Sequence, residues 1–136
     1  MRTVTIQVTE DQGKLISNAL DFYCRIGLGQ FNSIREHPSI QKYLWKNKRD
    51  EYHDIAEKEL TMARNKLFDM KVGLNGSKGI HSNDVDDSVR VAFDIYQVIR
   101  NEFWKNDFDR ISLLVDSSVH FTSNDKNVNK IKCEIK

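Results

Sequence analysis

The residues best suited to bind a ligand lie in the stretch GIHSNDVDDSVR, residues 79–90. It combines His81, Ser82 and Asn83, whose side chains donate and accept hydrogen bonds, with an acidic run and Arg90. One interpretation is a helix start, in which Ser82 or Asn83 is the N-cap and the aspartates complement the positive helix end. The other is a ligand pocket, in which His81 and Asn83 contact ribose hydroxyls or a base edge. Because the aspartates would repel a pyrophosphate, arginines elsewhere must bind the phosphates of such a ligand.

Arg100 and Trp104 are the best candidates for contacts with the charged and aromatic parts of that ligand. Arg100 lies at the border of a predicted apolar helix face, and Trp104 follows it by about one helical turn. A guanidinium forms forked, charge-assisted hydrogen bonds with phosphate, and an indole ring stacks on a base. The alternative for Arg100 is a surface salt bridge with Glu102 or Asp107.

Arg90 lies on the opposite, polar side of the same predicted helix. Asp86, Asp87 and Asp94 are all three or four positions from it, which is the spacing of a solvated ladder of salt bridges. Arg90 is therefore either a ligand contact or part of an exposed charged face. That exposed face is predicted to comprise Asn83, Asp86, Asp87, Arg90, Asp94, Gln97 and Asn101.

The stretch RIGLGQF, residues 25–31, supplies two more candidates. Arg25 provides another guanidinium, and Phe31 provides an aromatic surface. The two glycines between them are too few for a dinucleotide-binding fingerprint and lack its strand-turn-helix setting. A helix C-cap at Gly27 or Gly29 is the structural alternative.

An enzymatic function has weaker support in the sequence. His53 and Asp54 form the kind of His-Asp doublet found in metal-dependent phosphohydrolases, with His37 and His81 as further candidate ligands. Adjacent helical residues diverge by about 100°, and we find no second ligand pair spaced for one helix face. No G-x-S-x-G or P-loop motif is present. We therefore predict no catalytic residues, no metal ion and no cofactor.

The hydropathy pattern predicts that an α+β fold of one domain, residues 1–136, positions these side chains. Alternating apolar residues predict strands at residues 3–9 and 130–136, which pair in a small antiparallel sheet. Helical periodicity predicts three long helices at about residues 10–27, 49–70 and 83–105, and a short helix at about 31–37. Thr9 and Gln12 form the capping box that begins the first. The apolar stripes of the first two long helices are Leu15, Ala19, Phe22 and Ile26, and Tyr52, Ala56, Leu60, Ala63, Leu67 and Met70.

The third long helix has a wider apolar face, which spans an arc of roughly 220°. A face this wide requires neighbours on two sides, and a second copy of the chain is one candidate neighbour. The alternative is a central helix enclosed by the rest of its own chain. Asn83 and Arg100 would be about 25 Å apart on one helix, too far for a mononucleotide-sized ligand to bridge. If both contact one ligand, they must come from different subunits, so binding and homo-oligomerisation would be linked.

Composition excludes several classes of protein. Lys and Arg number 21 against 20 Asp and Glu, so the net charge of +1 does not favour long nucleic acid as a partner. Hydrophobic residues make up 39% and charged residues 30%, which is typical of a folded globular chain. No segment is apolar enough for a membrane span or an export signal. Cys24 and Cys133 form no metal or disulfide motif, so we expect a cytoplasmic protein.

Two segments of the chain resemble a family of small phage proteins that defeat the Thoeris bacterial defence system, the first-described Thoeris anti-defence family. They are ALDFYCRIGLGQFNSI and GIHSNDVDDSVRVAFDIYQVIRNEFW. Members bind a cyclic ADP-ribose isomer of the glycocyclic type and hold it intact, so that the defence effector is not activated. The resemblance implies that Asn83 and Arg100 belong to the ligand pocket. Trp104 stands where the family would have a second arginine.

The same resemblance implies how the protein assembles. Members are oligomeric, with pockets built by more than one protomer, so a homodimer or a larger assembly such as a hexamer is expected. Some members also sequester cyclic oligonucleotides at separate sites, which makes these a second candidate ligand. Two other functions stay open: a metal-dependent phosphohydrolase that degrades a cyclic nucleotide signal, and a helical adaptor without a nucleotide ligand. The predicted location is the cytoplasm of an infected bacterial host.

Overall fold

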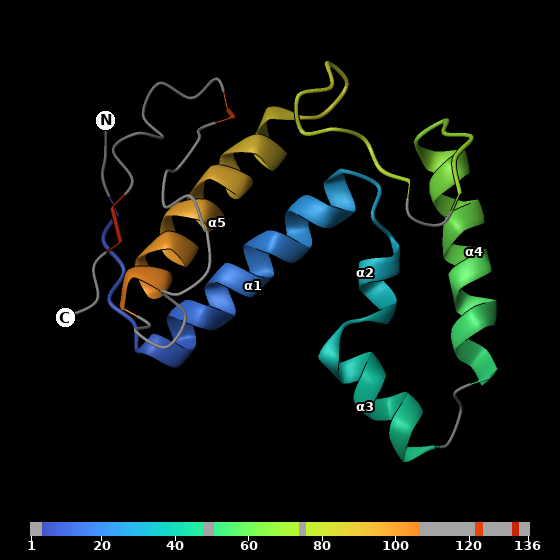
Figure 1. The fold of residues 1–136 in the computed structure, drawn as a ribbon, viewed down its shortest axis with the longest axis horizontal. Coiled ribbons are helices and arrows are strands. Elements are labelled where there is room, and N and C mark those ends of the chain that lie inside the picture. The colour runs from blue at the N-terminus through green and yellow to red at the C-terminus, as the bar shows by residue number, and fades with distance from the viewer. Residues whose placement is uncertain (1–3, 48–50, 74–75, 107–121, 124–131, 134–136) are drawn as a thin grey trace. The chain divides into compact units, whose positions relative to one another are not determined.

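The computed structural model describes residues 4–47, 51–73, 76–106, 122–123 and 132–133, with the side chains of 104–106 left out. The chain forms two compact units, residues 1–23 with 87–136 (unit 1) and residues 24–86 (unit 2). No helix in the described ranges combines the length and apolar character needed to cross a membrane. The helices in these ranges (Figure 1) are α1 (Glu10–Gly27), α2 (Asn32–Arg35), α3 (Pro38–Lys46), α4 (Glu51–Leu67) and α5 (Asp87–Asn106).

The predicted α+β fold is wrong, because the described part of the chain is helical and contains no strand. Residues 4–9 have no regular structure, and Val4, Ile6 and Val8 are all exposed. Alternation marks residues that can form a half-buried strand, but a strand also requires a neighbour to pair with and a core to cover. Of the predicted C-terminal strand, only Lys132 and Cys133 are described, and neither is in a strand.

Both predicted ends of α1 are confirmed. At the start, the Thr9 backbone N–H donates to Gln12 Oε1 at 2.9 Å, and the Gln12 N–H donates to Thr9 Oγ1 at 3.3 Å. At the other end, Gly29 has a φ of 80°. The N–H groups of Gly29 and Gln30 donate to Ile26 and Arg25 carbonyls, at 3.0 and 2.7 Å. This is the Schellman arrangement, which satisfies carbonyls that the helix end leaves unpaired.

In unit 1, α1 and α5 lie side by side and antiparallel (Figure 1). Near one end, Gly13 lies so close to the Phe103 ring that a Cβ on the glycine would be only 3.0 Å from Phe103 Cζ. Near the other, the Tyr23 and Ser88 hydroxyls are 2.9 Å apart. Small residues, Gly13 and Ser17, form the buried side of this part of α1 and allow close approach. The predicted apolar stripe is wrong here, since Leu15 is 68% exposed.

Helix α5 begins at Asp87, so the predicted start at Asn83 is wrong. Its polar side is not a solvated ladder, because Asp94 is 0% exposed and Gln97 is also buried. The Asp94 carboxylate accepts hydrogen bonds from the Thr122 N–H at 2.7 Å, the Thr122 hydroxyl at 2.9 Å and the Ser123 N–H at 2.9 Å. A polar helix face can be buried in this way because backbone donors replace the water that a carboxylate would otherwise bind.

In unit 2, α2 and α4 are in contact. Arg35 forms an ion pair with Glu57, and the Phe31 and Phe68 rings pack edge to face with centroids 5.7 Å apart. Helix α3 was not predicted as a separate element, although Pro38 is a favoured first helical residue. The predicted apolar stripe of α4 is only partly buried, since Tyr52 and Leu67, two of its members, are exposed.

Arg64 is 1% exposed and holds the loop that follows α4. Its guanidinium donates to the carbonyls of Val72, Gly73 and Gly76, each at 2.7 Å. These contacts, rather than an apolar cluster, determine the path of the described part of this loop. A buried guanidinium suits the role because it offers five donors in a fixed plane.

Candidate functional site

The loop that carries the predicted ligand contacts is attached to the turn after α1. The Lys78 backbone N–H donates to the Leu28 carbonyl at 2.8 Å, and Lys78 Nζ lies 5.4 Å from the centroid of the Phe68 ring. Phe68 in turn contacts Phe31. Residues 28–31, 68 and 78 therefore form one continuous cluster within unit 2, which includes the predicted aromatic contact Phe31.

His81, Ser82 and Asn83 follow this cluster along the chain. The Ser82 N–H donates to the Gly79 carbonyl at 2.9 Å, which closes a turn over residues 79–82. Ser82 also accepts at its carbonyl from the Val85 N–H. The predicted N-cap role of Ser82 or Asn83 is wrong, because α5 begins at Asp87. His81 and Asn83 are exposed in a loop, where they can reach a ligand.

Lys78 also fixes the acidic end of this loop. Its ammonium forms an ion pair with Asp84, and that hydrogen bond lowers the pKa of the Asp84 carboxyl. A lowered carboxyl pKa means that the contribution of the pair to stability is present at neutral pH and is lost as the pH falls through the folded-state value. Arg25, the other predicted cation of unit 2, is exposed and donates to Gln30 Oε1 at 3.3 Å.

The remaining described candidates lie on α5 in unit 1. The Arg100 guanidinium lies 5.0 Å from the centroid of the Tyr96 ring and donates to the Tyr96 hydroxyl at 3.4 Å. This aromatic partner was not predicted, although a Tyr four residues before an Arg is the spacing that stacks them. Arg90 has a side chain that is 12% exposed and lies 3.7 Å from Asp87. The side chain of Trp104 lies outside the described residues.

The predicted site residues thus fall into two groups. Because Asn83 is not on α5, the separation of about 25 Å that would apply along one helix does not apply to it and Arg100. The requirement that they come from different subunits therefore no longer follows from helix geometry. Unit 2 carries Arg25, Phe31, His81, Ser82 and Asn83, and α5 carries Arg90 and Arg100.

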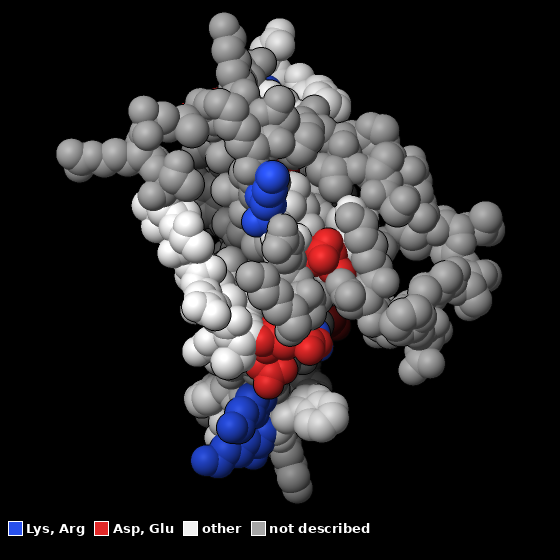
Figure 2. Space-filling view, turned by 90° about the vertical axis from the view of Figure 1, so that its left-hand side faces the viewer, with Lys and Arg blue, Asp and Glu red and all other residues white. Residues whose placement is uncertain are grey.

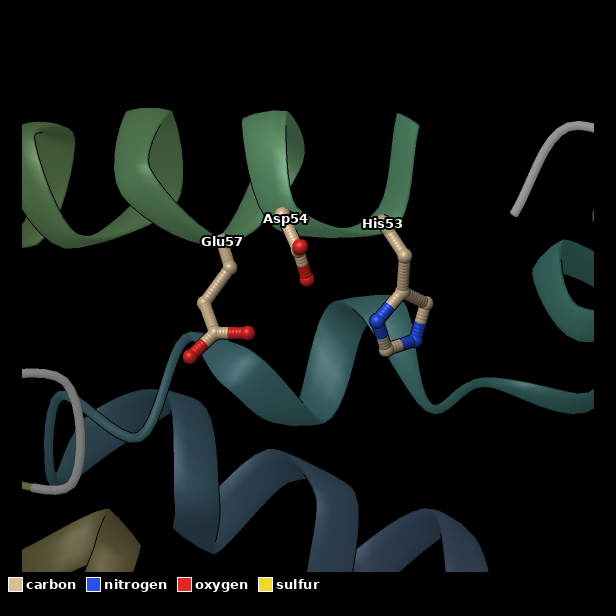
Figure 3. A group of neighbouring side chains, drawn as sticks. All are labelled: His53, Asp54 and Glu57. Carbon is tan, nitrogen blue, oxygen red and sulfur yellow. The ribbon is translucent and has the colours of Figure 1, made fainter. Parts of the chain in front are cut away.

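A second group of polar side chains lies on α4. His53, Asp54 and Glu57 each offer one ligand atom, and these atoms lie within 4.8 Å of one another (Figure 3). His53 and Asp54 were candidates for the predicted alternative, a phosphohydrolase, but Glu57 was missed. The spacing H-D-x-x-E is the signal for it, since Glu57 is four residues from His53 and three from Asp54.

The charges on the surface are mixed in sign. Figure 2 shows one face of the molecule, on which basic and acidic side chains lie close together. The described side chains on that face form no continuous basic surface of the kind that tracks a nucleic-acid backbone.

Comparison with known proteins adds no identification. No protein-family model matches the sequence, and no curated protein or solved structure matches it significantly.

Proposed function

We propose that this protein binds a cyclic ADP-ribose isomer and sequesters it without degrading it, in the cytoplasm of an infected bacterial host. The observation that carries this proposal is the attachment of the loop at residues 79–83 to the turn at residues 28–31. Lys78 anchors the start of that loop to Leu28 and to the Phe31–Phe68 ring pair, and the polar side chains of residues 81–83 follow it along the chain. The resemblance to anti-Thoeris proteins gives the ligand class.

Each candidate side chain has a chemical role in this proposal. Phe31 offers a ring for stacking, and His81, Ser82 and Asn83 offer hydrogen bonds to ribose or base. Arg25 of unit 2 and Arg100 of α5 are the two candidate cations for a pyrophosphate, and each charge-assisted hydrogen bond contributes about 1.5–3 kcal/mol. Arg100 is oriented by the Tyr96 ring, which lowers the entropy lost on binding. No covalent step is needed for sequestration.

The distribution of apolar residues supports an oligomer, as the proposal also requires. Among the described residues, four hydrophobic residues are buried, and fourteen large ones are exposed. None of the fourteen belongs to residues 87–103, the part of α5 whose side chains are described. They lie on the N-terminal segment, on α1, α3 and α4 and, with Val72, in the loop after α4, and Leu15, Trp45 and Met62 are all more than half exposed. Exposed apolar surface of this extent favours contact between copies of the chain.

Ligand depletion tests the proposal. The full chain is mixed with a cyclic ADP-ribose isomer, the protein is removed by filtration, and the ligand left in the filtrate is quantified. We expect near-stoichiometric depletion by the native chain and affinity about 10–100-fold lower for Arg25→Ala and Arg100→Ala, from the loss of one charged contact each. Lys58→Ala, which removes an exposed cation of α4, is the control and should deplete normally.

Three outcomes separate the candidate functions. Loss of depletion in the arginine variants alone supports sequestration at these residues. Appearance of a linear product in the filtrate supports the phosphohydrolase. A chain that leaves cyclic ADP-ribose isomers and cyclic oligonucleotides undepleted is an adaptor, and the proposal is then wrong.

A further inference from the structure

We propose that His53, Asp54 and Glu57 bind one divalent transition-metal ion, with Zn²⁺ as the best fit to the ligand set. All three residues belong to α4 in unit 2, and the proposal does not depend on the nucleotide site. In Figure 3 their side chains extend from the same side of the helix.

The spacing of the three residues places them on one helix face. His53 and Glu57 are four residues apart, and Asp54 and Glu57 are three apart, so both pairs are neighbours on the helix surface. The three ligand atoms lie within 4.8 Å of one another. Atoms that bind one zinc ion at about 2.0–2.2 Å lie roughly 3–3.5 Å from one another. Side-chain rotations that move the ligand atoms by about 1–2 Å would therefore bring the three to this spacing. None of the three is fully buried, which leaves room for this movement.

Neighbouring side chains contact two of the ligands. Arg35 pairs with Oε2 of Glu57, which leaves Oε1 directed to other partners. Gln41 Nε2 lies 3.4 Å from His53 Nε2 and donates to the Arg35 carbonyl at 2.8 Å, so α2 and α3 hold this side of α4. An amide nitrogen only donates, whereas the second ring nitrogen of a metal-bound histidine needs an acceptor, so the Gln41 amide must turn away from Nε2 when an ion binds through Nδ1. The charge of Arg35 opposes a bound cation, so we expect moderate affinity rather than that of a closed structural site.

The ligand types determine the metal. Mg²⁺ and Ca²⁺ bind oxygen, and one imidazole among three ligands disfavours both. No cysteine belongs to the group, which disfavours soft ions such as Cu(I). One nitrogen and two carboxylate oxygens suit Zn²⁺ or Co²⁺, and three protein ligands leave a coordination position for water.

Titration of the full chain with Zn²⁺ in a calorimeter tests the site, after treatment with a chelator and dialysis. We expect one equivalent to bind, with affinity at least 10-fold lower in His53→Asn and Asp54→Asn. The matched controls are His37→Asn and Glu59→Gln, which remove an imidazole and a carboxylate outside the group. Asn at position 37 retains an acceptor for the Ser39 N–H that His37 now caps. Both controls should bind Zn²⁺ within 2-fold of the native chain.

Co²⁺ provides a second readout, because its visible absorption reports inner-sphere ligands. We expect a spectrum that requires His53 and is displaced by one equivalent of Zn²⁺. Asp54 is exposed, so Asp54→Asn tests the site without risk to the fold. Absence of binding up to 1 mM Zn²⁺ overturns the proposal. Equal binding by the native chain, His53→Asn and Asp54→Asn shows an adventitious ion only and also overturns it.

Discussion

Among the described residues, each of the two units buries one charged side chain almost completely, and the two charges are opposite. In unit 1 it is Asp94, at 0% exposure, and in unit 2 it is Arg64, at 1%. The anion accepts hydrogen bonds from the backbone N–H groups of Thr122 and Ser123. The cation donates to the carbonyls of Val72, Gly73 and Gly76. A buried charge is costly unless it is fully hydrogen-bonded, so each one determines the course of the segment that supplies its partners.

The difference between the units lies in what the buried charge positions. Arg64 holds the start of the loop that continues through Lys78 to His81 and Asn83, the candidate ligand contacts of unit 2. Asp94 lies on α5 between Arg90 and Arg100 and attaches residues 122–123 to that helix. The buried charge of unit 2 thus holds backbone that leads to candidate residues, and the buried charge of unit 1 lies on the helix that carries two of them.

Removal of the buried cation should have the largest effect. Arg64→Ala leaves three carbonyls without their donor, and we expect a loss of about 3–5 kcal/mol in the free energy of unfolding. Arg64→Lys should lose less, since an ammonium keeps the charge but not the planar fork. Urea unfolding measures both. A loss below about 1 kcal/mol for Arg64→Ala would show that the loop does not depend on this side chain.

Removal of the buried anion in Asp94→Ala should lower the free energy of unfolding by about 2–4 kcal/mol, because the N–H groups of residues 122–123 lose a charged acceptor. Asp94→Asn should be intermediate, since its amide retains one acceptor oxygen. Hydrogen exchange at Thr122 and Ser123 should accelerate in both variants. Asp87→Asn is the control on the same helix, with an expected change of at most about 1 kcal/mol. Unchanged exchange in Asp94→Ala would contradict the assignment.

Substitutions at two helix ends of unit 2 should change the stability less than removal of a buried charge, and the two changes should have opposite signs. Gly29 after α1 and Asp69 after α4 both have positive φ, 80° and 49°. Gly29→Ala should destabilise by about 1–2 kcal/mol, with Gly29→Asn less affected, whereas Asp69→Gly should stabilise by up to about 1 kcal/mol. Thermal unfolding of the three variants measures these changes. If Gly29→Ala and Asp69→Gly changed the unfolding temperature equally and in the same direction, backbone strain would be excluded as the cause.

The two cysteines should differ in reactivity, which is the smallest expected effect. Burial, and then the nearby Glu102 carboxylate, raise the pKa of the Cys133 thiol, while Cys24 is buried at 2% exposure. Only the thiolate reacts with iodoacetamide, so Cys133 should be alkylated more slowly than an exposed cysteine until the pH exceeds its raised pKa. Cys24 should react after unfolding alone. Peptide mass spectrometry over a pH series measures both, and faster labelling of Cys24 in the native chain would contradict this order.

The sequence predicted the features that depend on local chemistry. The capping box at Thr9 and the glycine at the end of α1 were confirmed, because the residues that form these motifs are adjacent in the chain. The strand at residues 3–9 was wrong, since alternation says nothing about a pairing partner. The start of α5 was misplaced because Ser82 and Asn83 favour turns as much as N-caps.

Features that depend on distant backbone groups could not be predicted. Asp94 was assigned to an exposed face and Arg64 was not singled out, since their partners are N–H and C=O groups that every residue carries. The predicted ligand contacts stay a prediction, although unit 2 joins the turn after α1 to the start of the loop that carries three of them, through the Lys78–Leu28 backbone hydrogen bond. The aromatic partner of Arg100 and the carboxylate of Glu57 were missed, although helical spacing indicates both.

Release of the bound ligand tests the central functional claim most directly. The native chain is saturated with a cyclic ADP-ribose isomer, washed free of unbound ligand, denatured by heat and analysed for the nucleotide by mass spectrometry. We predict that the intact cyclic compound is recovered in near-stoichiometric amount. Recovery of a linear product, or of no nucleotide at all, would contradict sequestration as the function of this protein.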